Sequence, residues 1–211
     1  MIRMALTKGR IEEKALEMLT ACGYDLSSLS PENRGRKLLF RAENAPLEIV
    51  LAKSADVITY VSHGVCDCGI VGEDTIMESD GRFYELLDLN FSRCRFALAG
   101  PVGKYQSFIS GYGHKVIASK YPAVTKSYFE GRGFDVEIVK IEGSVELAPI
   151  LGLSDAIVDI VETGSTLKAN GLEVWEEVAD VSARLIANTV SVKMKKSDLD
   201  SLMSKLRTQI K

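Results

Sequence analysis

The sequence predicts an α/β fold divided into two domains. Short runs of β-branched and aliphatic residues alternate with segments whose apolar residues recur at helical spacing, as strands and helices do in an α/β sheet. With 211 residues, of which 46% are hydrophobic and 26% charged, the chain can bury one large core or two small ones. A polar joint at residues 90–94 marks a first crossing between lobes. We therefore expect domain I to hold residues 1–90 and 179–211, and domain II residues 91–178.

The first domain is expected to begin with a strand and an amphipathic helix. Residues 2–6 form the strand, and residues 10–22 form a helix that ends at Gly23. After a polar loop, the same patterns predict strands over 35–41 and 48–51, a helix over 55–62, a strand over 68–71 that opens a further helix, and a strand over 86–89. His63 is interpreted as a C-terminal residue of a helix, where the helix dipole favours it, and not as a catalyst.

The second domain continues the alternation. We expect strands over 95–99, 116–118, 136–141 and 156–161. A helix is expected over 123–131, and short helices are expected to open at 143–146 and at 166. Residues 100–113, which contain four glycines and a proline, are expected to form a mobile surface loop. Residues 173–181 and 182–192 are read as strands that lead the chain back. Ser197 and Asp198 are expected to cap the last helix. Its apolar stripe is interpreted as core or subunit packing and comprises Leu199, Leu202, Met203, Leu206 and Ile210.

Composition excludes several classes of protein. The net charge of −3 is spread along the chain without a basic stripe, so nucleic acid is not an expected partner. The N-terminus does not read as a signal peptide and no apolar run reaches membrane-spanning length, so we expect a cytoplasmic protein without membrane contact. The cysteines, Cys22, Cys66, Cys68 and Cys94, form no CxxC pair and are interpreted as buried thiols.

The stretch 155–167 carries the clearest chemistry. A strand over 156–161 holds Asp159 near its end, and acidic, hydroxylic and glycine residues follow before a helix begins. The N–H groups of such a loop can surround a phosphate, and a glycine lets the backbone approach it. Carboxylates suit ribose hydroxyls, or a Mg²⁺ ion carried by the ligand. The stretch predicts a phosphoribosyl site made of Asp159, Glu162, Thr163, Gly164, Ser165 and Thr166; the alternative is a capping hydroxyl and a turn glycine after an ordinary strand.

Two other turns carry polar groups suited to a ligand. Lys8, Gly9 and Arg10 follow the first strand, at the position where open α/β folds bind ligands. Cations are disfavoured at the N-terminus of a helix, which favours a binding role over a solvated surface. Ser144 precedes a short helix, where its hydroxyl and free N–H groups can meet an anion or a purine ribose.

Further charged positions lie at other strands. Taken alone, Arg36 and Lys37, which enter an expected strand, are interpreted as surface charges. Asp74 follows another strand and either accepts a hydrogen bond from an amine or caps the next helix.

The segment from Glu146 to Leu167 resembles the signature of ATP phosphoribosyltransferase, the first enzyme of histidine biosynthesis. It contains Glu146, Gly152-Leu153-Ser154, Ile157-Val158-Asp159-Ile160 and Thr163-Gly164-Ser165-Thr166-Leu167, without a departure from the pattern. Further segments extend the resemblance over essentially the whole chain: Thr-Lys-Gly-Arg, Arg-Lys-Leu-Leu-Phe, Gly-Glu-Asp, Leu-Asp-Leu, Ser-Lys-Tyr-Pro and Gly-Ser-Val-Glu-Leu-Ala-Pro.

The resemblance implies a two-domain fold similar to the type II periplasmic binding proteins, with the active site in the interdomain cleft. The implied reaction transfers the phosphoribosyl group of phosphoribosyl pyrophosphate (PRPP) to N1 of ATP and releases pyrophosphate, with Mg²⁺ carried by the substrate. The 5-phosphate would bind in the loop 162–166, called the phosphate loop below. The implied catalytic residues are Arg10 and Arg36, and the implied ATP-binding residues are Lys8, Gly9, Asp74, Ser144 and Glu146.

One position departs from the family pattern and one expectation concerns a partner. Lys53 stands where the family leads us to expect an arginine, so a bidentate contact there is not expected. The chain ends at Lys211, and we expect the short form of the enzyme, similar to members that pair with a histidyl-tRNA-synthetase-like regulatory subunit. The expected assemblies are a homodimer alone and a hetero-octamer with that partner.

Two alternative functions are left open by the sequence. A solute-binding or effector-sensing module of the same fold would bind without catalysis, because a fold does not fix a function. A nucleobase phosphoribosyltransferase would share a phosphate loop after an acidic strand end.

Overall fold

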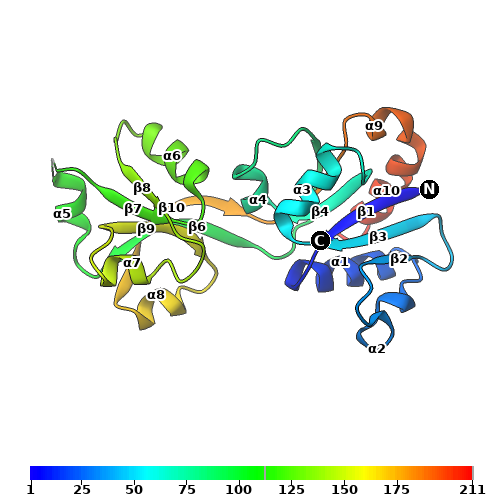
Figure 1. Ribbon diagram of the computed structural model, residues 1–211, viewed down its shortest axis with the longest axis horizontal. Coiled ribbons are helices and arrows are strands. Elements are labelled where there is room, and N and C mark those ends of the chain that lie inside the picture. Colours follow the sequence, from blue (N-terminus) through cyan, green and yellow to red (C-terminus); the bar gives the residue numbers. More distant parts are fainter. Residues whose placement is uncertain (112, 211) are drawn as a thin grey trace. The chain divides into compact units, whose positions relative to one another are not determined.

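The computed structural model describes residues 1–111 and 113–210 and divides into two compact units (Figure 1). Unit 1 comprises Met1–Ser92 and Ser182–Lys211, and unit 2 comprises Arg93–Val181. The expected crossings, after residues 90 and 178, lie close to these boundaries. Tyr112, in the loop expected over 100–113, and Lys211, at the end of the expected domain I, lie outside the described residues. Each unit is built on its own mixed sheet, so the predicted α/β class is confirmed.

Unit 1 contains a six-stranded sheet in the order β2-β3-β1-β4-β11-β5. Its strands are β1 (Ile2–Thr7), β2 (Leu39–Arg41), β3 (Leu47–Ala52), β4 (Cys68–Gly72), β5 (Tyr84–Asp88) and β11 (Ala183–Ala187). β1 runs parallel to β3 and β4, whereas β2 and β11 run antiparallel to their neighbours. The carboxyl ends of β1, β3 and β4 therefore lie at one edge of the sheet. The residues that follow these three strands include those expected to bind substrates.

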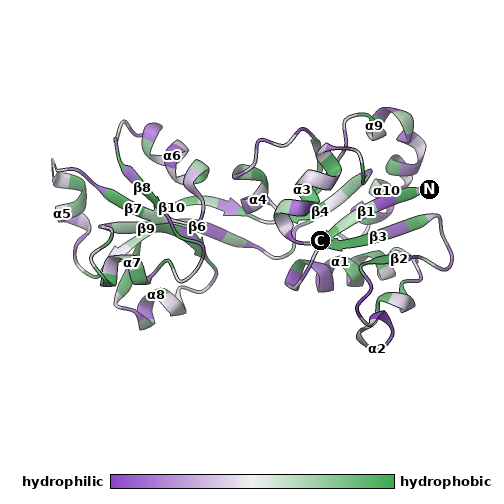
Figure 2. Ribbon diagram, in the orientation of Figure 1, coloured by the Kyte–Doolittle hydropathy of each residue, from purple (hydrophilic) through white to green (hydrophobic). Residues whose placement is uncertain are grey.

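The helices of unit 1 cover both faces of this sheet. They are α1 (Arg10–Ala21), the short 3₁₀ helix η1 (Ser27–Leu29), α2 (Pro31–Arg34), α3 (Ser54–Ser62), α4 (Glu73–Met77), α9 (Ser191–Met194) and α10 (Lys196–Arg207). Side chains alternate along β1, so Met4 packs with α1 and α10 on one face while Ala5 packs with α3 on the other. Because helices cover both faces of the sheet, side chains on both sides of these strands are largely apolar (Figure 2).

The apolar stripe of α10 belongs to the core of unit 1. Leu199, Leu202 and Leu206 are each at most 2% exposed and pack in the same cluster as Leu6. These three leucines are therefore core residues, whereas Met203 and Ile210 are partly buried and pack against the same cluster.

Unit 2 contains a five-stranded sheet in the order β10-β6-β9-β7-β8. Its strands are β6 (Cys94–Pro101), β7 (Val116–Ser119), β8 (Glu137–Lys140), β9 (Ala156–Val161) and β10 (Leu172–Val181). β9 is parallel to β7 and antiparallel to β6. β7, β8 and β9 all run in one direction, and their carboxyl ends share an edge.

Helices also cover both faces of the unit 2 sheet. They are α5 (Tyr105–Ser110), α6 (Pro122–Glu130), α7 (Leu147–Ile150) and α8 (Ser165–Ala169). Phe129 of α6 packs with Ile117 and Val158 on one face. Ala148 of α7 and Leu167 of α8 pack with Ile157 on the other, and Figure 1 shows α6 opposite α7 and α8.

The prediction of a loop over 100–113 is wrong for the middle of this stretch, where the chain forms helix α5. The glycines of this stretch flank the helix and do not interrupt it. Tyr105 and Phe108, three residues apart, both pack against Trp175 with ring centroids at 5.7 and 5.1 Å. Tyr105 also donates a 2.7 Å hydrogen bond to Glu176. Packing of this helix against β10 thus outweighs the tendency of the nearby glycines to form a loop.

Three other expected elements need correction. The strand expected over 35–41 contains only β2, because Gly35 turns the chain with φ 51°. The strand expected over 182–192 ends with β11, because Asn188 Oδ1 accepts hydrogen bonds from the N–H groups of Val190 and Ser191 and starts α9. The last helix begins at Lys196, so Asp198 lies inside its first turn and not at its cap.

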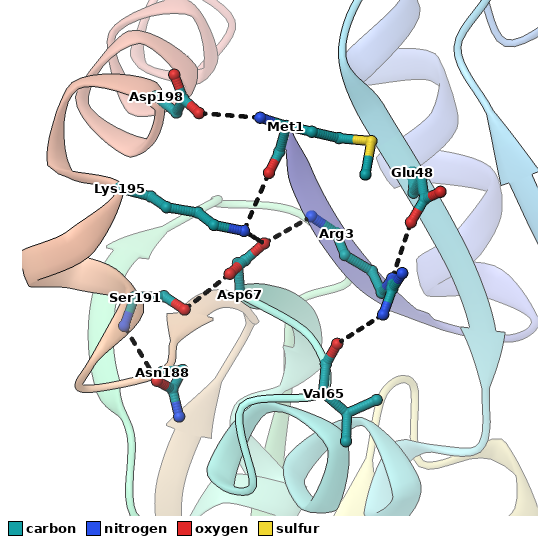
Figure 3. Close-up of polar contacts among 9 residues, drawn as sticks. All are labelled: Met1, Arg3, Glu48, Val65, Asp67, Asn188, Ser191, Lys195 and Asp198. Carbon is teal, nitrogen blue, oxygen red and sulfur yellow. Dashed lines mark hydrogen bonds and ion pairs between the residues drawn. The ribbon is translucent and has the colours of Figure 1, made fainter.

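A polar network fastens the C-terminal helices to the sheet of unit 1 (Figure 3). The carboxylate of Asp67 accepts hydrogen bonds from Lys195 Nζ, the Arg3 N–H and Ser191 Oγ at 2.7–2.8 Å. Burial opposes ionisation of Asp67, but these donors outweigh it and lower its pKa. Asp67 immediately precedes β4, so the network lies at the amino edge of the sheet and serves stability. No helix in the described part of the chain is both long and apolar enough to span a bilayer.

Candidate active site

The phosphate loop joins β9 to α8 in unit 2. Gly164 adopts the left-handed conformation with φ 76° and ψ 6°, which a glycine reaches without strain. Thr163 Oγ1 accepts a hydrogen bond from the Ser165 N–H at 3.3 Å, and its hydroxyl lies 3.0 Å from the Ser165 hydroxyl. Glu162, Thr163, Ser165 and Thr166 all reach the surface. The loop therefore presents hydroxyl groups and backbone to the surroundings on a short, internally bonded turn.

Asp159 lies in the carboxyl-terminal half of β9, and Ile160 and Val161 separate it from the loop. Burial raises the pKa of its carboxyl group, the nearby Glu146 carboxylate raises it further, and the Ile160 N–H and the Lys120 ammonium oppose both effects. Two carboxylates that influence each other in this way favour a cation or hydroxyl donors between them. Asp159 is thus within electrostatic reach of Glu146, although the two residues belong to different elements.

Ser144 lies in the turn that leads from β8 into α7. It is exposed and has φ 49°, one of three non-glycine residues with positive φ in the described chain. Such a conformation costs energy for a serine and is found most often at functional positions. β8 and β9 lie on either side of β7 and end at the same edge, so Ser144, Glu146 and Asp159 belong to one edge of the unit 2 sheet.

In unit 1, Lys8, Gly9 and Arg10 form the turn from β1 into α1. Gly9 has φ 96° and ψ −143°, a conformation accessible essentially only to glycine, and Lys8 and Arg10 are exposed on either side of it. Glu12, which no sequence pattern singled out, is only 5% exposed. Its carboxylate accepts from the Gly9 N–H at 3.4 Å and forms an ion pair with Arg34, and thereby holds the turn in place.

Arg36 and Lys53 lie at the same edge of unit 1. The Leu51 N–H donates to Leu38 O at 2.9 Å, which brings the segment before β2 beside the carboxyl end of β3. Arg36 is exposed and, among the described residues, has no salt-bridge partner; Lys53 is exposed and is the N-cap residue of α3. Together with Lys8, these side chains give the edge a positive charge that suits phosphate groups.

Asp74 follows β4 in the first turn of α4. An added Cβ at Gly72 would lie 2.1 Å from Asp74 Oδ1, so the Asp74 side chain folds back over the strand end. The neighbouring Glu73 has a structural role: it binds Arg184, which also pairs with Glu85 and Asp88. Unit 1 thus brings Lys8, Gly9, Arg10, Arg36 and Asp74 to one edge of its sheet.

Metal-ligating clusters and reactive thiols are not features of this site. Within residues 1–111 and 113–210, no group of three or more His, Cys, Asp or Glu side chains is arranged to hold a metal ion. The four cysteines are free, and burial raises the pKa of Cys66 to about 11 and that of Cys68 still further. Neither thiol is a nucleophile near neutral pH.

Comparison with known proteins decides the family. The family model for ATP phosphoribosyltransferase (HisG) matches residues 53–208. An ATP phosphoribosyltransferase of Clostridium kluyveri is 54% identical over 209 residues, which cover 99% of this chain and 94% of the relative. The chain belongs to the ATP phosphoribosyltransferase family. A Listeria innocua member is 49% identical over 210 residues, covering 100% of this chain and 96% of that one.

Solved structures agree with the family and with the fold. A chain of the ATP phosphoribosyl transferase (HisG:HisZ) complex from Thermotoga maritima is 36% identical, with a TM-score of 0.81 over 100% of this chain and 98% of that one. The periplasmic VFT2 domain of Bordetella pertussis BvgS, 14% identical, has a TM-score of 0.57 over 100% of this chain and 88% of that one. At that identity the likeness concerns the fold alone, and it supports the periplasmic-binding-protein-like class.

Membership in the ATP phosphoribosyltransferase family confirms the resemblance read from the sequence. It makes the protein a pentosyltransferase of the first step of histidine biosynthesis. The two alternatives, a binding module and a nucleobase phosphoribosyltransferase, are set aside.

Proposed function

We propose that this enzyme binds PRPP through unit 2 and transfers its phosphoribosyl group to N1 of ATP. The observation that carries the proposal is the pairing of a strand-end carboxylate, Asp159, with the left-handed turn at Gly164 and the hydroxyls around it. The 5-phosphate would bind Thr163, Gly164, Ser165 and Thr166. Asp159 and Glu162 would accept hydrogen bonds from the ribose hydroxyls.

The cations of unit 1 are proposed to act on the reacting phosphates. Arg10 and Arg36 would hold the diphosphate of PRPP and the triphosphate of ATP, because a planar guanidinium binds phosphate oxygens bidentately. Lys53 offers a single ammonium group at the same edge and would bind as a point charge. Both arginines are exposed, so substrate can reach them.

The remaining site residues are proposed to position ATP. Lys8 and the Gly9 backbone would contact its phosphates, and Asp74 would accept a hydrogen bond from the adenine amino group. Ser144 and Glu146 would meet the nucleotide or its ribose from unit 2. The strained φ of Ser144 supports a functional role for that turn.

The chemistry requires alignment and charge stabilisation more than proton transfer. The lone pair of adenine N1 attacks C1 of PRPP, the new N–C bond forms with inversion, and the C1–O bond breaks with its electron pair going to pyrophosphate. C1 develops oxocarbenium character while the leaving group gains negative charge, so fixed cations lower the barrier. Mg²⁺ would enter with the diphosphate of the substrate and share that charge.

A direct experiment tests the reaction. The purified protein is mixed with PRPP, Mg²⁺ and either ATP or free nucleobases, and the products are separated and identified by ultraviolet absorbance and mass. We expect N1-phosphoribosyl-ATP and pyrophosphate with ATP, and no product with free bases. Product formed with a free base would contradict the proposal.

A regulatory partner is proposed by analogy with the Thermotoga maritima complex, which contains HisG and HisZ. We propose that this chain is a homodimer alone and forms a hetero-octamer with a histidyl-tRNA-synthetase-like regulatory subunit. Because ATP and PRPP are cytoplasmic metabolites, we place the enzyme in the cytoplasm.

A further inference from the structure

Lys120 stands at the carboxyl end of β7, beside the proposed PRPP site, and has no role in the function proposed above. β7 pairs in parallel with β9, and Ser119 is the partner of Val158 in that register. Lys120 therefore leaves the sheet next to Asp159, which is still within β9 and pairs with Ala97 of β6. The pleat decides which way Asp159 faces, because successive side chains point to opposite faces of a sheet.

The alternation along β9 shows which face of the sheet Asp159 occupies. Ile117 and Val158 pack against α6, whereas Ala118 and Ile157 pack against α7 and α8. Continuing the alternation along β9, Asp159 belongs to the face of α7 and α8, where the phosphate loop and Glu146 also lie. Lys120 is the first residue beyond β7 and starts from the same edge of the sheet. The Lys120 ammonium and the Asp159 carboxylate are close enough to influence each other's charge.

The backbone on both sides of Lys120 is held firmly. Ser119 is fully buried; its hydroxyl donates to Val158 O at 2.6 Å and accepts from the Tyr121 N–H at 2.9 Å. Tyr121, only 8% exposed, packs edge-on against Phe96 with ring centroids at 4.9 Å. Thr125 Oγ1 donates to Tyr121 O at 2.8 Å. Because both neighbours of Lys120 are buried and hydrogen-bonded, the backbone from which its side chain extends is held in place.

The charge of Lys120 is not neutralised by an ion pair within the described residues. Its ammonium lies 5.7 Å from the centre of the Tyr121 ring, and in the described part of the chain it forms no salt bridge. Two other exposed lysines of unit 2 do have acidic partners: Lys140 pairs with Glu142 and Lys126 with Glu130. Lys120 can therefore bind a ligand without first breaking an ion pair.

The sheet order shows which part of a ligand would reach Lys120. α8 connects β9 to β10, and β6 lies between these two strands in the sheet. The phosphate loop therefore leaves the end of β9 on the side of β6. β7 lies on the other side of β9. Asp159 is thus flanked by the phosphate loop on one side and by Lys120 on the other.

We propose that Lys120 binds the diphosphate of PRPP and stabilises it as it leaves. PRPP carries its 5-phosphate on C5 and its diphosphate on C1, at opposite ends of the ribose. With the 5-phosphate in the phosphate loop and the ribose hydroxyls on Asp159, the diphosphate end extends toward β7. When the C1–O bond breaks, the electron pair stays on the diphosphate oxygen, and the ammonium of Lys120 balances the added charge. This placement rests on the proposed function of the loop.

Three ligands separate the subsites. PRPP carries both phosphate groups, inorganic pyrophosphate only the leaving group, and ribose 5-phosphate only the 5-phosphate. Their dissociation constants are measured by calorimetry with Mg²⁺ at constant ionic strength. The variants are Lys120→Met, Lys120→Arg, and the control Lys126→Met, which removes another exposed lysine, on α6. Thermal melting verifies that each variant is folded.

We expect Lys120→Met to weaken pyrophosphate and PRPP binding by about 10- to 100-fold, the range for losing one hydrogen bond to a charged group. Ribose 5-phosphate binding should stay within about twofold, Lys120→Arg should recover most of the affinity because it keeps the charge, and Lys126→Met should change nothing. Unchanged pyrophosphate affinity in Lys120→Met would overturn the proposal. An equal loss for ribose 5-phosphate would overturn it too, because Lys120 would then belong to the 5-phosphate subsite.

The phosphate loop can fail independently of Lys120. Gly164→Ala is expected to weaken ribose 5-phosphate and leave pyrophosphate unchanged. If Gly164→Ala leaves ribose 5-phosphate affinity intact while Lys120→Met lowers pyrophosphate affinity, the loop assignment is wrong and the diphosphate contact of Lys120 stands.

Discussion

Replacing Gly164 by alanine isolates the contribution of the phosphate loop. The residue has φ 76°, and a left-handed conformation costs an alanine about 1–2 kcal/mol. The smaller conformational freedom of alanine in the unfolded chain returns about 0.4–1 kcal/mol. The net loss of stability is about 1 kcal/mol, or a few degrees in Tm for a unit of this size. An added Cβ would meet only Val161 Cγ1, at 3.8 Å, so the protein itself has room for it.

The effect on PRPP should be larger than the effect on stability. The new methyl group projects toward open space beside the loop, where we place the 5-phosphate, and would weaken at least one charge-assisted hydrogen bond. We expect KM for PRPP to rise about 10- to 100-fold, with KM for ATP nearly unchanged. Initial rates are followed by the absorbance of the product while one substrate is varied at saturation of the other.

A second glycine provides a matched control. Gly171, just beyond the other end of α8, has φ 70° and open space where an alanine methyl group would lie, so Gly171→Ala imposes similar backbone strain away from the loop. It should lower Tm comparably and leave KM for PRPP unchanged. A PRPP KM within about twofold of wild type in Gly164→Ala would refute the phosphate cradle. An equal rise in both variants would show that strain in α8, and not contact with phosphate, causes the effect.

Four further predictions address catalysis, stability and regulation. Arg10→Ala and Arg36→Ala should each lower kcat about 10²-fold with little change in Tm; normal kcat with a large loss of stability would make them structural cations. Asp159 has a raised pKa, so its contribution to stability falls as pH rises from about 4 through the folded pKa. Asp159→Asn should therefore raise Tm at pH 7 while it weakens PRPP binding, and a lower Tm would contradict this. Asp67 has a lowered pKa, so its stabilisation is present at neutral pH and is lost as pH falls through the folded pKa. Asp67→Asn should lower stability at pH 7 by about 2 kcal/mol, with the difference from wild type shrinking in acid melts. Histidine should not inhibit the isolated chain and should inhibit it only together with the regulatory subunit; tight, saturable inhibition of the chain alone would refute the two-chain account.

Local sequence predicted most elements because their signals agreed with their surroundings. The helix from Arg10 and the strands β1, β3, β4, β7 and β9 appear where hydrophobic periodicity and turn residues placed them. The predictions failed where contacts between residues far apart in the sequence determined the local structure. Phe108 and its neighbours became helical because Trp175, far along the chain, offered an aromatic surface. Asn188 ended a strand through hydrogen bonds to the following turn, which hydrophobicity alone does not predict.

The sequence by itself determined the family, the α/β class and the residue types at each strand end, because these depend on short motifs and on periodicity within a few residues. Tertiary structure alone decided which of those ends meet. The parallel register of β7 and β9 places Lys120 beside Asp159, and the edge shared by β8 and β9 brings Glu146 to the same carboxylate. Register and strand order come from burying two faces of a sheet at once. No local pattern encodes that requirement, so the lysine remained unassigned until the strands were paired.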